Sequence, residues 1–280
     1  MSLSKPLNLE VMGCHFSVDC RDSTSPGIIA ACYSAFLTGQ AEPGGVATHY
    51  RILGADSGWR LECEGDVIDC ATLADLIYDF EKDMTVRVQL QRPDLLFIHG
   101  AVVAKDDRCV IIAGESGAGK STLCWTLCNA GFEYLSDELA PVEPGAGIVQ
   151  PYPHALCLKS RPTFMRELSP RVVDAERTLH IPLSDIPGPH ALSATKLAAI
   201  VFIDKTVDIE RGALPQEIGA AEAAARLYAN SLNQLAHERE GLGAVSRIAS
   251  DTPAWSLQRA EPAAMVNAIR QIFRHRPQHA

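Results

Sequence analysis

The sequence lacks a long apolar segment, a basic excess and a paired cysteine motif, and each absence excludes a class of protein. Its longest apolar run, Leu197 to Ile203, is far too short to span a bilayer. No apolar stretch follows Lys5, so no signal peptide is expected. The formal net charge of −9 argues against a nucleic-acid binder with a broad basic surface. We therefore expect no membrane segment and no nucleic-acid partner, whereas a basic peptide partner is compatible with the charge.

Nine cysteines are scattered along the chain, and none forms a C-x-x-C pair. Scattered cysteines without a secretion signal are typical of a reducing compartment, so we expect a cytoplasmic protein. Cys14, His15 and Cys20 offer donor types that zinc uses, but no fourth ligand is evident. We therefore predict no zinc site at this position.

One stretch carries a motif with a defined chemistry. Residues 111–122 read Ile-Ile-Ala-Gly-Glu-Ser-Gly-Ala-Gly-Lys-Ser-Thr and fill the pattern G-x-x-x-x-G-K-[ST]. An apolar run enters the motif as a buried strand would, and apolar residues at helical spacing follow it. The sequence therefore predicts a strand, a phosphate-binding loop and a helix.

The loop supplies the predicted nucleotide site: Gly114, Glu115, Ser116, Gly117, Ala118, Gly119, Lys120, Ser121 and Thr122. Glycines allow the backbone N–H groups to turn toward phosphate oxygens, and the N-terminus of the next helix favours the same anion. Lys120 is expected to reach the β- and γ-phosphates, and the Ser121 hydroxyl to bind Mg²⁺. ATP and Mg²⁺ are therefore the expected cofactors.

The 280 residues suit one large domain or two small ones, and we place a boundary near residue 92. Region 1–92 is expected to be a smaller α+β region, and region 93–280 an α/β catalytic domain that ends in helices. The elements expected in the first region are strands at 9–11 and 16–18, a helix at 26–37, a hairpin at 49–63 and a helix after Thr72.

The second region is expected to alternate strands and helices. The strands are placed at 95–104, 109–113, 132–136, 148–150, 155–159, 196–203, 244–248 and 254–257, and the later helices at 215–236 and from Pro262 onward. The proline-rich residues 160–195 are expected to form an irregular functional loop, and residues 275–279 a disordered tail.

Two adjacent acids, Asp137 and Glu138, follow the strand after the P-loop helix. Phosphoryl transfer needs a carboxylate at the metal and a group that takes the acceptor proton, so this pair is the best-placed candidate. A helix cap is the alternative role for the pair. Asp204 competes as the metal carboxylate, because four apolar residues precede it, and that arrangement suits an ATPase. His99, alone in an apolar run, is either a core histidine or a site residue.

Residues 98–142 resemble the catalytic core of bacterial HPr serine kinase/phosphorylase. A His-Gly pair at residue 99 precedes Lys120 by 21 residues, and the two acids follow it at 17 and 18, as in that family. Residues 90–275 are similar to the stand-alone group that includes HprK-related kinase A, and the asparagine-bearing segment 230–233 is one of the features that carry this likeness. The resemblance implies a P-loop kinase core of the HPr kinase and phosphoenolpyruvate-carboxykinase type.

The resemblance also implies roles for single residues. His99 and Lys120 match catalytic positions, Glu138 the proton acceptor, and Asp137 an acid of the metal and substrate site. Glutamate replaces the family's aspartate at 138, which leaves open which acid is the base. The metal-site ligands implied here are Ser121 and Asp137.

Other positions depart from the family pattern. Cys157 stands where the family has a further metal-site glutamate, while Lys159 keeps a positive charge and is carried over as a catalytic residue. The segment tied to phosphorylase activity has no clear counterpart, so a kinase without phosphorolysis is expected.

The implied reaction is transfer of the γ-phosphoryl group of ATP to a serine of a small protein or peptide. Related kinases act on ribosomally made precursor peptides. A regulatory or assembly ATPase and a small-molecule kinase remain as alternatives. The oligomeric state is open, and relatives that assemble offer only an analogy for a homo-oligomer.

Overall fold

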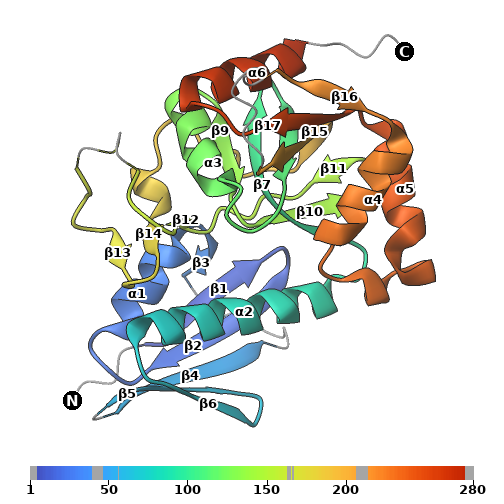
Figure 1. Ribbon diagram of the computed structural model, residues 1–280. Coiled ribbons are helices and arrows are strands. Elements are labelled where there is room, and N and C mark those ends of the chain that lie inside the picture. The colour runs from blue at the N-terminus through green and yellow to red at the C-terminus, as the bar shows by residue number, and fades with distance from the viewer. Residues whose placement is uncertain are drawn as a thin grey trace. The chain divides into compact units, whose positions relative to one another are not determined.

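The computed structural model describes residues 5–39, 47–55, 57–162, 165, 167–205 and 214–274. Within these residues the chain is a mixed α/β protein with several sheets (Figure 1). It divides into two compact units: residues 1–91 with 154–185, and residues 92–153 with 186–280. The expected tail at 275–279 lies outside the described residues.

The first unit is built on a sheet with the strand order β3-β1-β2-β4-β5-β6, and the long helix α2 runs along it (Figure 1). Strands β12, β14 and β13 form a second, small sheet. In chain order its elements are β1 (Leu7–Val11), β2 (Cys14–Cys20), α1 (Ser25–Cys32), the 3₁₀ helix η1 (Ser34–Phe36), β3 (Leu37–Thr38), β4 (Thr48–Ala55), β5 (Gly58–Cys63), β6 (Asp66–Cys70), α2 (Leu73–Gln91), β12 (Leu156–Leu158), β13 (Val173–Asp174), β14 (Leu179–Ile181) and η2 (Leu183–Asp185).

Helix α2 has a defined start and a defined buried face. The Thr72 hydroxyl accepts a hydrogen bond from the Asp75 amide, and the Asp75 carboxylate accepts one from the Thr72 amide, as in a capping box. Leu76, Ile77, Phe80, Met84 and Val88 are buried at helical spacing. The Phe80 ring packs edge-on against Tyr50 of β4, with 5.0 Å between ring centroids. The apolar face of α2 therefore covers the sheet.

The second unit is a mixed sheet with the strand order β11-β10-β7-β8-β15-β17-β16, and β9 pairs with β7. Strand β11 also pairs with β15, so β11, β10, β7, β8 and β15 form a closed ring of hydrogen-bonded neighbours. Its elements are β7 (Leu96–Lys105), β8 (Arg108–Ala113), α3 (Lys120–Asn129), β9 (Glu133–Ser136), β10 (Leu139–Glu143), β11 (Ile148–Val149), β15 (Thr195–Asp204), β16 (Gln216–Ile218), α4 (Ala220–Asn230), η3 (Gln234–Ala236), η4 (Glu238–Gly241), α5 (Leu242–Asp251), β17 (Ala254–Gln258) and α6 (Pro262–Arg274).

Helices cover the sheet of the second unit through separate sets of contacts. Buried residues of α4 and α5 join Leu96, Ile98, Val102 and Ala104 of β7 in one apolar core. Helix α3 packs against β7 and β9, and α6 packs against α3 and β15 (Figure 1). None of the helices among the described residues is long and apolar enough to cross a membrane.

Several sequence-based expectations differ from the structure. Residues 244–248, expected as a strand, belong to α5, because Leu242, Val245, Ile248 and Ala249 follow helical spacing over a longer window. The helix expected at 215–236 is β16, then α4, then a 3₁₀ turn. The helix expected at 26–37 ends at Cys32.

The segment expected as an irregular loop contains β13, β14 and η2, and these group with the N-terminal residues. This grouping differs from the expected division, which assigned every residue after 92 to one domain. Pairing of β12 with β14 holds the segment together, and the Ala155 amide donates to the Cys32 carbonyl at 2.8 Å, which ties it to α1.

Candidate functional site

The glycine-rich loop leaves β8 at Gly114 and enters α3 at Lys120. Gly114, Gly117 and Gly119 have φ angles of +151°, +82° and +99°, which other residues rarely adopt. A Cβ on Gly114 would also stand 2.7 Å from the Ile203 carbonyl oxygen, so this position has no room for a side chain. The strand and helix expected around the motif are therefore present, and the glycines sit where the backbone requires them.

Lys120 points back into the loop that precedes it. Its ammonium donates to the carbonyl oxygens of Gly114 at 2.8 Å and Glu115 at 3.3 Å, and the residue is buried. Lys205 lies 2.9 Å from the Glu115 carboxylate, and this ion pair lowers the pKa of the Glu115 carboxyl. The Lys120 ammonium therefore lies inside the loop, and the salt bridge between Lys205 and Glu115 lies on its outside.

The strand register brings the remaining predicted residues to the same row of the sheet. Gly100 of β7 pairs with Ala113, the residue before the loop, and His99 pairs with Leu139 of β10. On the other side of β8, Ala113 pairs with Phe202 of β15. His99, the acidic pair and the start of the loop are therefore neighbours across the sheet, where parallel strands β8, β15 and β17 end. Ligands commonly bind at the carboxyl ends of parallel strands, in open α/β sheets and in closed barrels alike.

The acidic pair interrupts what is otherwise one long strand. Strands β9 and β10 both pair antiparallel with β7, at Val102 and at His99 respectively, and Asp137-Glu138 lies between them. The Ser136 hydroxyl accepts hydrogen bonds from the amides of Glu138 and Leu139, which fixes the interruption. The pair is therefore held by a β-sheet irregularity, and the alternative of a helix cap does not apply.

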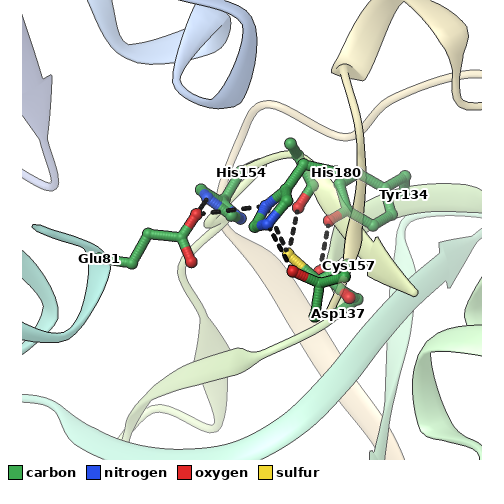
Figure 2. A network of polar contacts seen from close by, with 8 residues as sticks. Glu81, Tyr134, Asp137, His154, Cys157 and His180 are labelled. Carbon is green, nitrogen blue, oxygen red and sulfur yellow. Dashed lines mark hydrogen bonds and ion pairs between the residues drawn. The ribbon is translucent and has the colours of Figure 1, made fainter. Parts of the chain in front are cut away.

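The two acids have different surroundings. Asp137 is buried, and its Oδ1 accepts a hydrogen bond from the Tyr134 hydroxyl at 3.0 Å (Figure 2). Glu138 is only half-buried. Cys124 of α3 lies close by, and burial, with Cys128 and then Asp137, raises the pKa of its thiol well above the usual value. One carboxylate is therefore fixed by a neighbour, and the other is the more accessible.

Asp204, the competing metal carboxylate, is engaged in contacts of its own. Its Oδ1 lies 2.9 Å from the Arg226 guanidinium, and its Oδ2 accepts a hydrogen bond from the Ser256 hydroxyl. Arg226 also pairs with Glu222 at 2.7 Å. These contacts link β15, α4 and β17, which is a structural role.

The other predicted residues lie in different places. Ser121 and Thr122 are half-buried in the first turn of α3. Lys159 is exposed, directly after β12, and belongs to the first unit, so its catalytic role stays a prediction. Cys157, in β12, lies 3.2 Å from a His180 ring nitrogen.

Sequence reasoning missed three residues near this edge. Tyr134 fixes Asp137, and the Arg259 guanidinium lies 4.0 Å from where a Cβ on Gly119 would stand. Asn233 accepts a hydrogen bond from the Phe97 amide and donates to the Leu95 carbonyl, at the edge of β7 beyond the end of β8. Only the asparagine-bearing segment gave a signal, through its position in the family resemblance.

Comparisons with known proteins place the chain in no family. No family model matches the sequence, and no curated protein matches it. Among solved structures, the chain is similar to the Hpr(Ser) kinase/phosphatase from Coxiella burnetii, with 13% identity and a TM-score of 0.30. The alignment covers 62% of this chain and 94% of that one. This is a distant likeness.

Proposed function

We propose that this protein is an ATP-dependent kinase that transfers the γ-phosphoryl group to a hydroxyl, with a serine of a small protein or peptide as acceptor. One observation carries the proposal: the Lys120 ammonium lies inside a glycine loop at the sheet edge that also bears Asp137, Glu138 and His99. The proposal of a serine acceptor rests on the sequence resemblance, and ribosomally made precursor peptides are among the acceptors it covers. The expected absence of phosphorolysis rests on the same resemblance.

The loop and helix α3 would hold the phosphates. Backbone N–H groups of residues 114–119 and the N-terminus of α3 favour anions. On nucleotide binding, the Lys120 ammonium would exchange its carbonyl partners for phosphate oxygens, since a hydrogen bond to an anionic oxygen is stronger than one to a neutral carbonyl. Arg259 would add a second positive charge beside the last glycine of the loop.

The donor set at this edge fits Mg²⁺. Ser121 offers a hydroxyl and Asp137 a carboxylate, and hard oxygen donors are those that Mg²⁺ prefers. The Tyr134 hydrogen bond leaves Asp137 in one orientation, as an outer partner does for a metal ligand. When bound, Mg²⁺ would offset charge on the phosphate oxygens.

Glu138 is the better candidate for the proton acceptor. It is the more accessible of the two acids, and its amide donates a hydrogen bond to the Ser136 hydroxyl. In the proposed step, the acceptor hydroxyl gives its proton to Glu138 as its oxygen bonds to the γ-phosphorus. The bond between that phosphorus and the bridging oxygen breaks, and ADP leaves. His99 lies on the adjacent strand as a polar neighbour of the reacting groups.

The ATPase alternative needs Asp204 as the metal carboxylate. The ion pair with Arg226 and the hydrogen bond from Ser256 occupy both of its oxygens, which favours Asp137 instead. A small-molecule kinase would use the same residues, so the acceptor decides between it and a protein or peptide kinase.

The test follows label from the γ-phosphate of ATP in a mixture of protein, Mg²⁺ and soluble cell extract. We expect label in a small protein or peptide, and we expect Asp137→Ala to abolish it while Asp204→Ala retains it in the folded fraction. Label in a metabolite would establish the small-molecule kinase. Label only in free phosphate, with loss in Asp204→Ala, would establish the ATPase and refute the proposal.

A further inference from the structure

Four donor side chains from distant parts of the sequence meet in the first unit. They are Cys32 at the end of α1, Glu81 on α2, His154 before β12 and His180 on β14. One possible ligand atom from each lies within 4.8 Å of those of all the others. No other such group of three or more is found among the described residues.

The two imidazoles are aimed at one carboxylate oxygen. His154 Nε2 lies 2.8 Å from Glu81 Oε1, and His180 Nδ1 lies 3.4 Å from the same atom (Figure 2). Two ring nitrogens and a carboxylate oxygen therefore already converge, and Cys32 adds a free thiol.

An outer hydrogen bond selects the ligating nitrogen of His180. Its Nε2 lies 2.8 Å from the Thr178 hydroxyl oxygen, which leaves Nδ1 facing Glu81. Metal-binding histidines commonly donate their second ring N–H to such a partner, which fixes the tautomer and the ring orientation. The Tyr33 ring packs edge-on against His154, with 4.8 Å between ring centroids, and so holds the second imidazole.

The cluster is buried. Cys32, His154 and His180 are 2%, 1% and 3% exposed, and the Glu81 side chain is 15% exposed. Burying a carboxylate is unfavourable unless a positive charge compensates for it. A bound cation supplies that charge and uses all four donors together.

We propose that Cys32, Glu81, His154 and His180 form a binding site for a divalent transition metal ion of the zinc class. One sulfur, two imidazole nitrogens and one carboxylate oxygen are ligands that Zn²⁺ accepts in tetrahedral geometry. Four protein ligands leave no open position, so the role is structural. Cys157 contacts the same His180 nitrogen but stands outside the group of four.

Such an ion would join segments that lie far apart in the sequence. Its ligands span residues 32 to 180 and would tie residues 154–185 to α1 and α2 within the first unit. Because a metal bound only by the folded state stabilises it, removing the ion would loosen this unit first. The proposal is independent of the nucleotide site, which offers oxygen ligands.

The experiment measures metal content and the absorption spectrum of the full chain loaded with Co²⁺ in the absence of nucleotide. We expect one ion per chain, tetrahedral ligand-field bands and a thiolate-to-cobalt charge-transfer band. Cys32→Ser should abolish the charge-transfer band, and Cys157→Ser, the matched control at the same histidine, should keep it. His180→Ala should lower the metal content at least tenfold.

If a variant does not fold, the spectrum of the wild-type protein by itself still tests the proposal. Absence of tetrahedral and thiolate bands in wild-type protein would overturn the proposal and leave a hydrogen-bonded buried cluster. Loss of the band in Cys157→Ser with its retention in Cys32→Ser would overturn the assigned ligand set.

Discussion

Replacing Tyr134 by phenylalanine removes a single oxygen atom from the candidate site. The Tyr134 hydroxyl donates to Asp137 Oδ1 at 3.0 Å, and both residues are buried. In Tyr134→Phe the ring still fills its space, but the carboxylate loses a donor. A hydrogen bond to a charged group contributes about 1.5–3 kcal/mol. We expect the free energy of unfolding to fall by up to about that amount.

Tyr134→Phe should also lower the affinity of the site for Mg²⁺. Loss of an outer hydrogen bond to a metal ligand typically lowers metal affinity or activity by about 10–100-fold. The assay follows the rise in unfolding midpoint caused by ATP as Mg²⁺ is titrated, which needs no acceptor. For Tyr134→Phe, the half-maximal Mg²⁺ concentration should rise within that range.

A matched control exists in the other unit. The Tyr50 hydroxyl donates to Asp83 at 2.6 Å, and Tyr50 is buried like Tyr134. Asp83 keeps an ion pair with Arg87 at 2.6 Å, so Tyr50→Phe should lower stability by about 1 kcal/mol and leave the Mg²⁺ titration unchanged. An equal shift in both variants, or none in Tyr134→Phe, would refute the assignment of Asp137 to the metal.

Three further changes test other parts of the account. Gly114→Ala places a Cβ against the Ile203 carbonyl at a positive φ, so it should destabilise the protein by about 1–3 kcal/mol and abolish ATP-induced stabilisation, as thermal unfolding would show. Asp204→Asn breaks a part-exposed ion pair with Arg226, so urea unfolding should show a loss of about 1 kcal/mol or less while phosphoryl transfer persists. Asn233→Ala removes the hydrogen bonds to the Phe97 amide in β7 and to the Leu95 carbonyl just before it, and native-state hydrogen exchange of the first half of that strand should quicken about tenfold.

The sequence predicted the elements with strong local patterns. The glycine loop, its strand and its helix have a motif, and α2 has a cap and a long apolar stripe. Residues 244–248 of helix α5 are wrongly predicted as a strand, because five residues are too few to distinguish a helical period from a strand.

The candidate site can be predicted only in part from the sequence, because some of its contacts arise only when distant strands pair. Asp137 and Glu138 were found beside the loop by their spacing, but their placement depends on β9 and β10 pairing with one strand. The cluster of Cys32, Glu81 and two histidines has no sequence motif, because its members come from four separate segments and meet only in the folded unit. In β2, by contrast, Cys14 and Cys20 share a face but stand six residues apart, and His15 lies on the opposite face, so these donors do not meet.

The most direct test of the central claim is ATP binding measured by calorimetry in the presence of Mg²⁺. Wild-type protein should bind one ATP per chain, and Lys120→Ala should bind it at least tenfold more weakly, because the ammonium inside the loop is lost. Lys196→Ala is the matched control, since its ammonium also donates to a backbone carbonyl, that of Ala146, but at the start of β15. Its affinity should equal that of wild type. Absence of ATP binding in wild type, or equal affinity in all three proteins, would contradict the assignment of residues 114–122 to the phosphates of ATP.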